Sequence, residues 1–360
     1  MTRRARILEI CSYPPPRAGW SMRVEMVAKG LRAEGHECIA LNTGMNRRVP
    51  SPEYETVMDP LDFVRKVWRF SWRGYTIHSH VNGDSLKGFV RTLLSQTIGV
   101  LTFKRGYLTF HAGVDQPFFP RHKAPWLFPM YWVMFTIPRR IICNSEPVKR
   151  LVAAYGVSAG KIVSIPAFTR QYLEFERVTL APAIEAFFER FPHVLFTYIR
   201  IREGFNLATL MEGFAEVAHA RTDVGLLFVG VTDDIDPALW ADVQARMAAH
   251  DLGSRICIVD DMDHDQFLSA LTRSAMYVRT PTTDGVSSSV LESMALKIPV
   301  VAAENGTRPP GVVTFGPDQP GHLASQVQHV LSNRTDVVNG IVAPAIHDTL
   351  RDEIDILTGA

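Results

Sequence analysis

The sequence has few of the features that mark membrane-spanning or secreted proteins. No apolar run reaches the roughly 18 residues that a transmembrane helix needs, and the N-terminal stretch has no small-residue cleavage site. The four cysteines, Cys11, Cys38, Cys143 and Cys257, lie far apart in apolar stretches and form no CxxC or Cys/His spacing. We therefore expect buried, reduced thiols in a cytoplasmic protein.

Motifs of the common nucleotide-binding classes are missing too. No GxGxxG follows the first strand-like segment and no GxxxxGK(S/T) occurs, which argues against a dinucleotide oxidoreductase and a P-loop enzyme. There is no low-complexity tract and no short-period repeat. With 360 residues, 46% hydrophobic and 21% charged, the chain is typical of a globular protein with two domains.

The formal net charge of +1 conceals a strong asymmetry. Residues 1–170 carry 25 Lys and Arg against 11 Asp and Glu, a balance of +14, whereas residues 171–360 carry 13 against 26, a balance of −13. A strongly positive half attracts nucleic acid, anionic lipid or phosphorylated ligands, although such charge also serves solubility alone. No recognition motif organises the basic residues, so we expect no nucleic-acid partner.

Short β-branched runs alternate with amphipathic stretches along nearly the whole chain. This alternation predicts an α/β fold of two doubly wound parallel sheets, with functional residues in the loops that follow strands. The expected strands are Arg6–Cys11, Glu37–Asn42, Tyr75–His80, Tyr107–Phe110, Ile141–Asn144, Lys161–Ile165, Val194–Ile199, Val224–Gly230, Arg255–Val259, Met276–Thr280 and Val300–Ala303.

The alternation is interrupted near residues 166–182, between the basic and the acidic half. We interpret this stretch as a linker and expect a basic N-terminal domain over residues 1–168 and an acidic C-terminal domain over residues 169–344. Residues 345–360 are expected to form a helix that packs back on the N-terminal domain.

The segment 280–301 carries the most specific pattern: a strand, a Gly-bearing loop, a helix and a second strand, with Asp284 and Glu292 separated by seven residues. A carboxylate in the loop can accept hydrogen bonds from sugar hydroxyls, and one a turn into the helix can accept them from a ribose. Ser287, Ser288 and the N–H groups at the helix start can face a diphosphate between them. Each group matches one part of a sugar nucleotide.

This segment resembles the signature of the family-4 retaining glycosyltransferases of GT-B fold, of the bacterial surface-polysaccharide type. The resemblance covers roughly residues 6–305 and includes a Gly-bearing loop near Gly19, the HxH strand end at His78 and His80, a THG-like turn at His111, and the helix start at Ser145. It implies two Rossmann-like domains that face each other across a cleft, the N-terminal one binding the acceptor and the C-terminal one binding the nucleotide sugar.

By this resemblance, His111 lies near the reacting sugar and Asp284 is the second catalytic residue. The resemblance places His80 and Asp115 on the acceptor side. It implies no metal ion and no cofactor beyond the nucleotide-diphosphate sugar itself. The implied donor-binding residues are Gly19, Arg200, Arg202, Gly285, Val286, Ser287, Ser288 and Glu292.

The chain departs from the family at the two cations that normally clamp the donor diphosphate. Tyr198 and Glu203 stand at these positions. Arg200 and Arg202 lie close by and are suited to bidentate phosphate contacts, but residues in this pattern also line solvated loops, and both readings stay open. Asp284 replaces the usual Glu, and Pro166-Ala-Phe replaces the usual PNG.

Two patterns could be taken for metal sites. Asp234-Ile-Asp236 and Asp261-Met-Asp263 have DxD spacing, but both are more typical of helix starts, with Asp236 and Asp263 as N-caps. His78, His80 and His111 could contribute to a zinc site, but no closing carboxylate or thiol lies nearby in sequence.

Two segments of the basic half suggest contact with anionic lipid. Along residues 61–73, apolar side chains that include Trp68 and Trp72 occupy one arc, and Arg65, Lys66, Arg69 and Arg73 lie opposite. The aromatic stretch 126–140 ends in two arginines. Each helix could instead pack its apolar arc on the sheet, but the charge balance favours peripheral membrane attachment.

The sequence therefore predicts an enzyme that transfers a hexose from a nucleotide-diphosphate sugar to a saccharide acceptor, which we expect to be lipid-linked. It is expected in the cytoplasm, on the inner face of the cell membrane, in polysaccharide biosynthesis. Two alternatives stay open: a catalytically silent GT-B scaffold, because the cation pair is missing, and a nucleotide-sugar epimerase.

Overall fold

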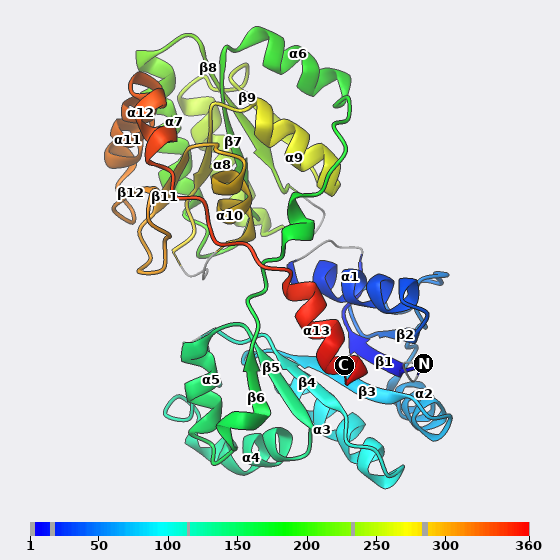
Figure 1. The fold of residues 1–360 in the computed structure, drawn as a ribbon. Helices are drawn as coiled ribbons and strands as arrows, with labels where there is room; N and C mark the ends of the chain where they lie inside the picture. The colour runs from blue at the N-terminus through cyan, green and yellow to red at the C-terminus, as the bar shows by residue number, and fades with distance from the viewer. Residues whose placement is uncertain (1–3, 15–18, 114–115, 232–234, 283–286, 360) are drawn as a thin grey trace. The chain divides into compact units, whose positions relative to one another are not determined.

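The computed structural model describes residues 4–14, 19–113, 116–231, 235–282 and 287–359 (Figure 1). The contacts divide the chain into two units. The N-terminal unit comprises Met1–Gln171 and His347–Ala360, and the C-terminal unit comprises Tyr172–Ile346. Each unit has its own six-stranded parallel sheet with interleaved helices, so the predicted α/β fold of two doubly wound parallel sheets is confirmed.

The sheet of the N-terminal unit has the strand order β2-β1-β3-β4-β5-β6. All of its strands overlap the segments expected from β-branched, buried runs. They are β1 (Arg6–Cys11), β2 (Glu37–Asn42), β3 (Thr76–Val81), β4 (Tyr107–Phe110), β5 (Arg140–Cys143) and β6 (Ile162–Ser164).

Helices lie on both faces of this sheet, as Figure 1 shows. They are α1 (Gly19–Ala33), α2 (Pro60–Trp72), α3 (Leu86–Leu101), α4 (Phe128–Thr136), α5 (Glu146–Ala153) and the C-terminal α13 (Thr349–Thr358), with short 3₁₀ turns η1 (Pro125–Leu127), η2 (Ala159–Lys161) and η3 (Arg170–Leu173). In this described part of the chain, no helix is both long and apolar enough to cross a bilayer.

The alternation of side chains along β1 separates the two helical layers. Ile7 and Cys11 pack with residues of α1 and α13, whereas Leu8 and Ile10 pack with residues of α2 and α3. Because side chains two residues apart lie on the same face of a strand, Glu9 faces the layer of α1 and α13. A carboxylate is thereby buried in the centre of an otherwise apolar strand, at 0% exposure.

The sheet of the C-terminal unit has the order β12-β11-β10-β7-β8-β9. Its strands are β7 (His193–Tyr198), β8 (Val224–Val229), β9 (Ile256–Val259), β10 (Met276–Arg279), β11 (Val300–Ala303) and β12 (Val313–Phe315). Among the strands of the described residues, only β12 was missing from the sequence prediction. The helices are α6 (Pro182–Arg190), α7 (Leu207–Ala220), α8 (Pro237–Ala249), α9 (His264–Arg273), α10 (Ser288–Ala295), α11 (Pro320–Ser332) and α12 (Arg334–Gly340).

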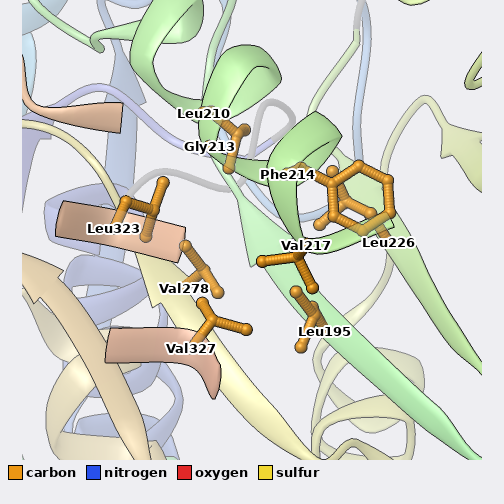
Figure 2. Close-up of a pocket in the computed structure, with 9 residues that line it drawn as sticks. All are labelled: Leu195, Leu210, Gly213, Phe214, Val217, Leu226, Val278, Leu323 and Val327. Carbon is orange, nitrogen blue, oxygen red and sulfur yellow. The ribbon is translucent and has the colours of Figure 1, made fainter. Parts of the chain in front are cut away.

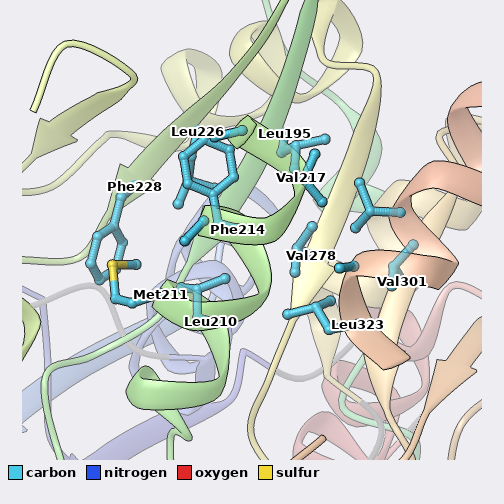
Figure 3. Packing of buried hydrophobic residues seen from close by; sticks show 14 of the residues in the cluster. Leu195, Leu210, Met211, Phe214, Val217, Leu226, Phe228, Val278, Val301 and Leu323 are labelled. Carbon is cyan, nitrogen blue, oxygen red and sulfur yellow. The ribbon is translucent and has the colours of Figure 1, made fainter. Parts of the chain in front are cut away.

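One core of this unit lies between the sheet, α7 and α11. Figure 3 shows Leu210, Met211 and Phe214 of α7 packed against Leu226 and Phe228 of β8. A gap of about 10 Å³ remains within this core, lined only by apolar residues (Figure 2). This volume holds no more than one water molecule, so the gap is a packing defect rather than a ligand site.

Helix ends follow the sequence signals. Gly35 has a left-handed φ of 82° just after α1, and the Ser145 hydroxyl caps α5. Asp236 caps α8 by accepting from two backbone N–H groups, and Asp263 forms a capping box with Gln266. The capping interpretation of these two aspartates is therefore confirmed.

The cysteines are free thiols. Cys11, Cys38 and Cys143 are buried, as predicted, but Cys257 on β9 is only partly buried.

The C-terminal helix is attached to the N-terminal unit by a buried ion pair. Arg23 Nε of α1 lies 2.7 Å from Glu353 Oε2 of α13, with both side chains at 5% exposure or less. The same guanidinium donates to the hydroxyl and carbonyl oxygens of Thr349 and to the carbonyl of Ala167. One side chain thus ties α1, α13 and the segment that leads out of the unit.

The Arg23→Ala variant is expected to lose about 3–5 kcal/mol of unfolding free energy, since it leaves the Glu353 carboxylate buried without its partner. Arg351→Ala is the matched control, because Arg351 also joins α13 to the end of α1, through Glu34, but in an exposed pair. Chemical denaturation followed by circular dichroism measures both. Equal losses in the two variants would contradict a structural role of the buried pair.

Candidate functional site

The predicted donor-binding residues of the C-terminal unit lie around the start of α10. Ser287 is the N-cap of α10, but its hydroxyl makes no capping bond and instead lies 2.8 Å from the hydroxyl of Ser289. The first-turn N–H groups of α10, which begins at Ser288, are therefore not capped by this side chain. Such a helix start binds anionic groups such as phosphate. Asp284, Gly285 and Val286 lie outside the described residues.

Glu292 lies one turn into α10 and is 7% exposed. No described residue is hydrogen-bonded to its carboxyl group, and burial raises its pKa to about 8. A buried carboxyl without a partner is unfavourable when ionised. Hydrogen bonds from hydroxyl groups to this carboxyl group would make its ionised form more favourable.

The loop that carries Arg200 and Arg202 follows β7 and is attached to the loop that follows β10. Asn206 Nδ2 donates to the Thr280 carbonyl, and the Thr280 hydroxyl donates to the Phe205 carbonyl. Both loops extend from the carboxyl ends of parallel strands, where ligands of such sheets bind.

The two arginines alternate with fully buried side chains. Ile199 and Ile201 are at 1% and 0% exposure, whereas Arg200 is half-buried and Arg202 exposed. Glu203, at the position where the family has a lysine, is exposed.

Tyr198 takes the position of the family's arginine, and its hydroxyl donates to Asp261 at 2.9 Å. The Tyr277 hydroxyl, which also lies 2.8 Å from Ser289, donates to the Tyr198 carbonyl. The end of β7 and the first turn of α10 are therefore joined through Tyr277. The loop that carries Arg200 and Arg202 therefore starts close to the first turn of α10, where phosphate binding is predicted.

In the N-terminal unit, the structure places His111 directly after β4. Its ring is partly exposed and packs against Trp20, with ring centroids 5.0 Å apart. Gly19 is the first residue of α1, next to Trp20. Asp115 lies outside the described residues. Trp20 was not among the predicted site residues, although it follows the Gly-bearing loop directly.

His80 and His78 lie behind His111 and are buried. His80 Nδ1 lies 3.0 Å from His111 Nε2, and His80 Nε2 lies 2.8 Å from Glu9 Oε2. His78 Nδ1 lies 3.0 Å from Glu9 Oε1, and His78 Nε2 lies 2.8 Å from the Thr109 hydroxyl. Both ring nitrogens of His80 are thus occupied within the protein.

The charges of this cluster depend on Glu9. Burial alone would raise the pKa of the Glu9 carboxyl, but the charge of His78 and the hydrogen bonds from His78 and His80 outweigh burial and lower the pKa to about 2. Burial alone would lower the pKa of His78, but the Glu9 carboxylate raises it. Burial and the charge of His78 lower the pKa of His80, and burial holds the pKa of His111 well below its usual range.

Glu9, His78 and His80 are also the one group, among the described residues, whose side chains are close enough to share a metal ion. The sequence showed no carboxylate near these histidines because Glu9 is 69 positions from His78. The signal for it was a lone acid inside the apolar segment 6–11, in register with His78 on the neighbouring strand. The nitrogen–oxygen distances of 2.8–3.0 Å are those of hydrogen bonds. They are shorter than the roughly 3.3 Å that separates two ligand atoms each about 2.0–2.1 Å from a tetrahedral zinc ion.

The predicted lipid-binding segments have a mixed outcome. Phe63, Val67 and Phe70 of the apolar arc are buried against the sheet, whereas Trp68 and Trp72 are exposed and stacked on each other. Helix α3 contacts both α2 and α4, and the exposed apolar residues of these elements define an apolar face. They are Leu61, Trp68, Trp72, Leu86, Val90, Leu94, Val100, Leu101, Phe103, Trp126, Trp132 and Val133.

The family model described as glycosyl transferases group 1 matches residues 192–333, a range that lies within the C-terminal unit. Comparison with curated proteins gives no match.

Several solved structures have similar folds. The chain aligns with HepE from Anabaena in complex with UDP-glucose at a TM-score of 0.72 and 15% identity, covering 98% of this chain and 99% of that one. Sucrose-phosphate synthase from Thermosynechococcus elongatus gives 0.64 and 16%, covering 98% and 95%. A structure assigned to UDP-N-acetylglucosamine 2-epimerase from Listeria monocytogenes gives 0.68 and 14%, covering 99% and 97%.

At these identities the structural likeness concerns the fold, and it confirms the predicted GT-B fold. Together with the family match, it also confirms the predicted enzyme class, a glycosyltransferase.

Replacement of Glu292 by Gln is expected to change the pH dependence of stability. Because the pKa of about 8 in the folded protein exceeds the ordinary value of 4.5, the unfolded chain loses this proton first as pH rises. The wild-type protein therefore loses stability between these pH values, at about 1.4 kcal/mol per pH unit for this group alone. The glutamine variant lacks this term, so its stability relative to wild type should increase from pH 5 to pH 8 in urea unfolding. A difference that stays constant with pH would contradict a buried, protonated Glu292.

Proposed function

We propose that the protein is a retaining glycosyltransferase that moves a hexose from a nucleotide-diphosphate sugar to a saccharide acceptor, which we take to be lipid-linked. The observation that carries this proposal is Glu292, a buried carboxyl group without a hydrogen-bond partner among the described residues. The hydroxyls of a ribose are donors of the kind that this group lacks. The complexes of HepE with UDP-glucose and with UDP support a nucleotide-sugar donor.

In this proposal the diphosphate binds at the start of α10, where Ser287, Ser288 and the first-turn N–H groups lie. Arg200 and Arg202 supply positive charge from the neighbouring loop, in place of the family's clamp. Negative charge develops on the departing diphosphate as its bond to the sugar breaks, so positioned donors lower the barrier. We therefore propose a reaction that needs no metal ion.

The family resemblance implies that His111 contacts the transferred sugar and that Asp284 binds its hydroxyls. The acceptor hydroxyl then attacks the sugar carbon on the face from which the diphosphate leaves. The new bond to the acceptor oxygen forms as the bond to the diphosphate oxygen breaks, and that diphosphate oxygen takes the acceptor's proton. This course accounts for retention without a covalent sugar–enzyme intermediate.

Calorimetry with UDP-glucose, followed by a panel of GDP- and ADP-sugars, tests donor binding. We expect Glu292→Ala to weaken binding by roughly 10- to 100-fold, because it removes the hydrogen bonds between the Glu292 carboxyl group and the two ribose hydroxyls, each worth about 0.5–1.5 kcal/mol. Glu216→Ala, which changes an exposed acid on α7, should leave binding unchanged.

The same assay separates the alternatives. Absence of binding by every compound would favour the silent scaffold. Isomerisation of the bound sugar without an acceptor would favour an epimerase. Release of free nucleotide only when a saccharide acceptor is added supports the transferase.

We further propose that the apolar face of the N-terminal unit binds the surface of an anionic membrane, which would place the enzyme in the cytoplasm beside a lipid-linked acceptor. Phe103 is the strongest observation: it is 94% exposed and has a φ of 62° at the end of α3. This left-handed conformation favours glycine and is unfavourable for a bulky residue. In this position the Phe103 side chain is almost fully exposed to solvent and buries almost none of its apolar surface within the folded unit. Insertion among lipids would bury it.

Charge supports the same partner, since exposed basic residues accompany the apolar ones. Arg65 and Arg69 lie on α2, and Arg139 and Arg140 follow α4; all four are exposed. Aromatic residues flanked by Lys and Arg are typical of interfacial contacts with anionic lipid.

Co-sedimentation with phosphatidylglycerol vesicles at low salt tests this surface. The double variant Trp72→Ser/Phe103→Ser should bind at least about tenfold more weakly than the wild type, because two large apolar side chains are no longer transferred from water into the lipid. Val342→Ser, at another exposed apolar residue, which lies in the C-terminal unit, is the control and should bind like the wild type. Equal binding by all three proteins, or no binding by the wild type, would contradict the proposal.

A further inference from the structure

A continuous chain of hydrogen bonds runs from the buried carboxylate of β1 to the predicted sugar-binding histidine. Glu9 contacts His80 at 2.8 Å, and His80 contacts His111 at 3.0 Å. Glu9 and His80 are 0% and 2% exposed, whereas His111 is partly exposed. The chain therefore leads from the interior of the N-terminal unit to its surface.

The direction of each hydrogen bond follows from the chemistry of Glu9. An ionised carboxylate only accepts hydrogen bonds, so His80 must carry its proton on Nε2. A neutral imidazole has one N–H, which leaves His80 Nδ1 as an acceptor. The bond between His80 and His111 can then form only if His111 donates from Nε2. A neutral His111 is left with an unprotonated Nδ1, which no described residue contacts through a hydrogen bond.

The surroundings favour these protonation states. His78 donates to the second oxygen of Glu9 and balances its charge, so His80 need not be protonated. Arg23 of α1 adds a positive charge that disfavours a charged His111. The negative charge of Glu353 on α13, which pairs with Arg23, favours the protonated forms of His78 and His80.

We propose that Glu9 is a positioning residue that acts through His80 to hold His111 as the neutral Nε2–H tautomer, so that His111 Nδ1 accepts a hydrogen bond from a sugar hydroxyl. The identity of the hydroxyl-bearing ligand rests on the proposed function, but the tautomer does not. A site of this kind accepts a hydroxyl and disfavours a carboxylate or carbonyl oxygen at the same position, because both the ring nitrogen and the oxygen would be acceptors.

A metal ion bound by Glu9, His78 and His80 would reverse this arrangement. The ion would take the lone pair of His80 Nε2, and the remaining proton on His80 Nδ1 would be donated to His111 Nε2. His111 would then carry its own proton on Nδ1 and present a donor. The two readings predict opposite tautomers of one histidine, so a single measurement separates them.

Long-range ¹⁵N–¹H correlation spectra of the full chain, labelled with ring-¹⁵N histidine, report the tautomer directly. The His111 signals are assigned by their loss in His111→Gln. We expect His111 with its proton on Nε2 and an unprotonated Nδ1, and a protein without stoichiometric zinc by elemental analysis. A proton on Nδ1, a protonated ring, or bound zinc with altered His80 signals would each overturn the proposal.

Two buried substitutions then test whether Glu9 is the source. Glu9→Gln replaces one acceptor oxygen by an NH₂ donor and should convert His111 into a mixture of tautomers. Thr109→Val is the matched control: it removes a hydrogen bond to His78 at an equally buried position but leaves the branch through His80 intact. Its His111 should stay in the Nε2–H form. The same single tautomer in both variants would overturn the role of Glu9, and if Glu9→Gln does not fold, the wild-type spectrum still decides the tautomer.

The catalytic consequence is read from kinetics with the donor and acceptor found by the assays above. Glu9→Gln should lower kcat about tenfold while the KM for the donor changes less than about twofold, since the nucleotide is held by the other unit. If kcat is unchanged in a variant with mixed tautomers, Glu9 fixes the tautomer of His111 but this tautomer does not contribute to catalysis, which would overturn the catalytic part of the proposal. Failure of donor binding in the wild type would instead affect only the proposed function, and the spectroscopic result would stand.

Discussion

The N-terminal unit depends on the neutralisation of charges that are buried over one face of its sheet. Glu9 lies in β1, between β2 and β3, with no exposure. Arg23 and Glu353 lie on α1 and α13, in the helical layer that covers this face of the sheet. A buried charge without a partner destabilises a fold by several kcal/mol, whereas a fully satisfied network gives it a unique arrangement. The two histidines of β3 hydrogen-bond to Glu9, and Arg23 pairs with one oxygen of Glu353 and with the backbone of α13. The C-terminal helix is therefore required for this unit although it lies at the end of the chain.

The two units use buried carboxyl groups in opposite ways. Glu9 is surrounded by donors that lower its pKa to about 2, so it is a permanent acceptor within the fold. Glu292 has no hydrogen-bond donor among the described residues, and burial raises its pKa to about 8, so it is protonated near neutral pH. Environments that separate the pKa values of two similar groups in this way are typical of functional sites. The same residue type thereby serves positioning in one unit and, in our proposal, recognition in the other.

The fold was predictable from the sequence because the strands of parallel sheets are β-branched runs at regular intervals. Of the twelve strands in the described residues, eleven were recognised in this way. The strand β12 was missed, although β6, which is also a three-residue edge strand, was recognised. Residues whose roles depend on local chain order, such as Ser145 and Asp263, were also recognised as caps. Glu9 was missed as a partner of His80 because pairing between strands is invisible to local spacing. On α2, periodicity identified the apolar arc but could not divide it into the buried Phe63 and the exposed Trp72.

The protonation state of His111 also constrains where the leaving group must be stabilised. In our proposal His111 is a neutral imidazole that donates its Nε2–H to His80, so it supplies neither positive charge nor a proton to a departing diphosphate. We propose that the charge that develops on the diphosphate is met within the C-terminal unit, by the first-turn N–H groups of α10 and by Arg200 and Arg202. The replacement of the family's arginine by Tyr198, which is committed to Asp261, makes these two residues more important. The proposed activity therefore divides into a neutral contact to the sugar from one unit and a cationic contact to the diphosphate from the other.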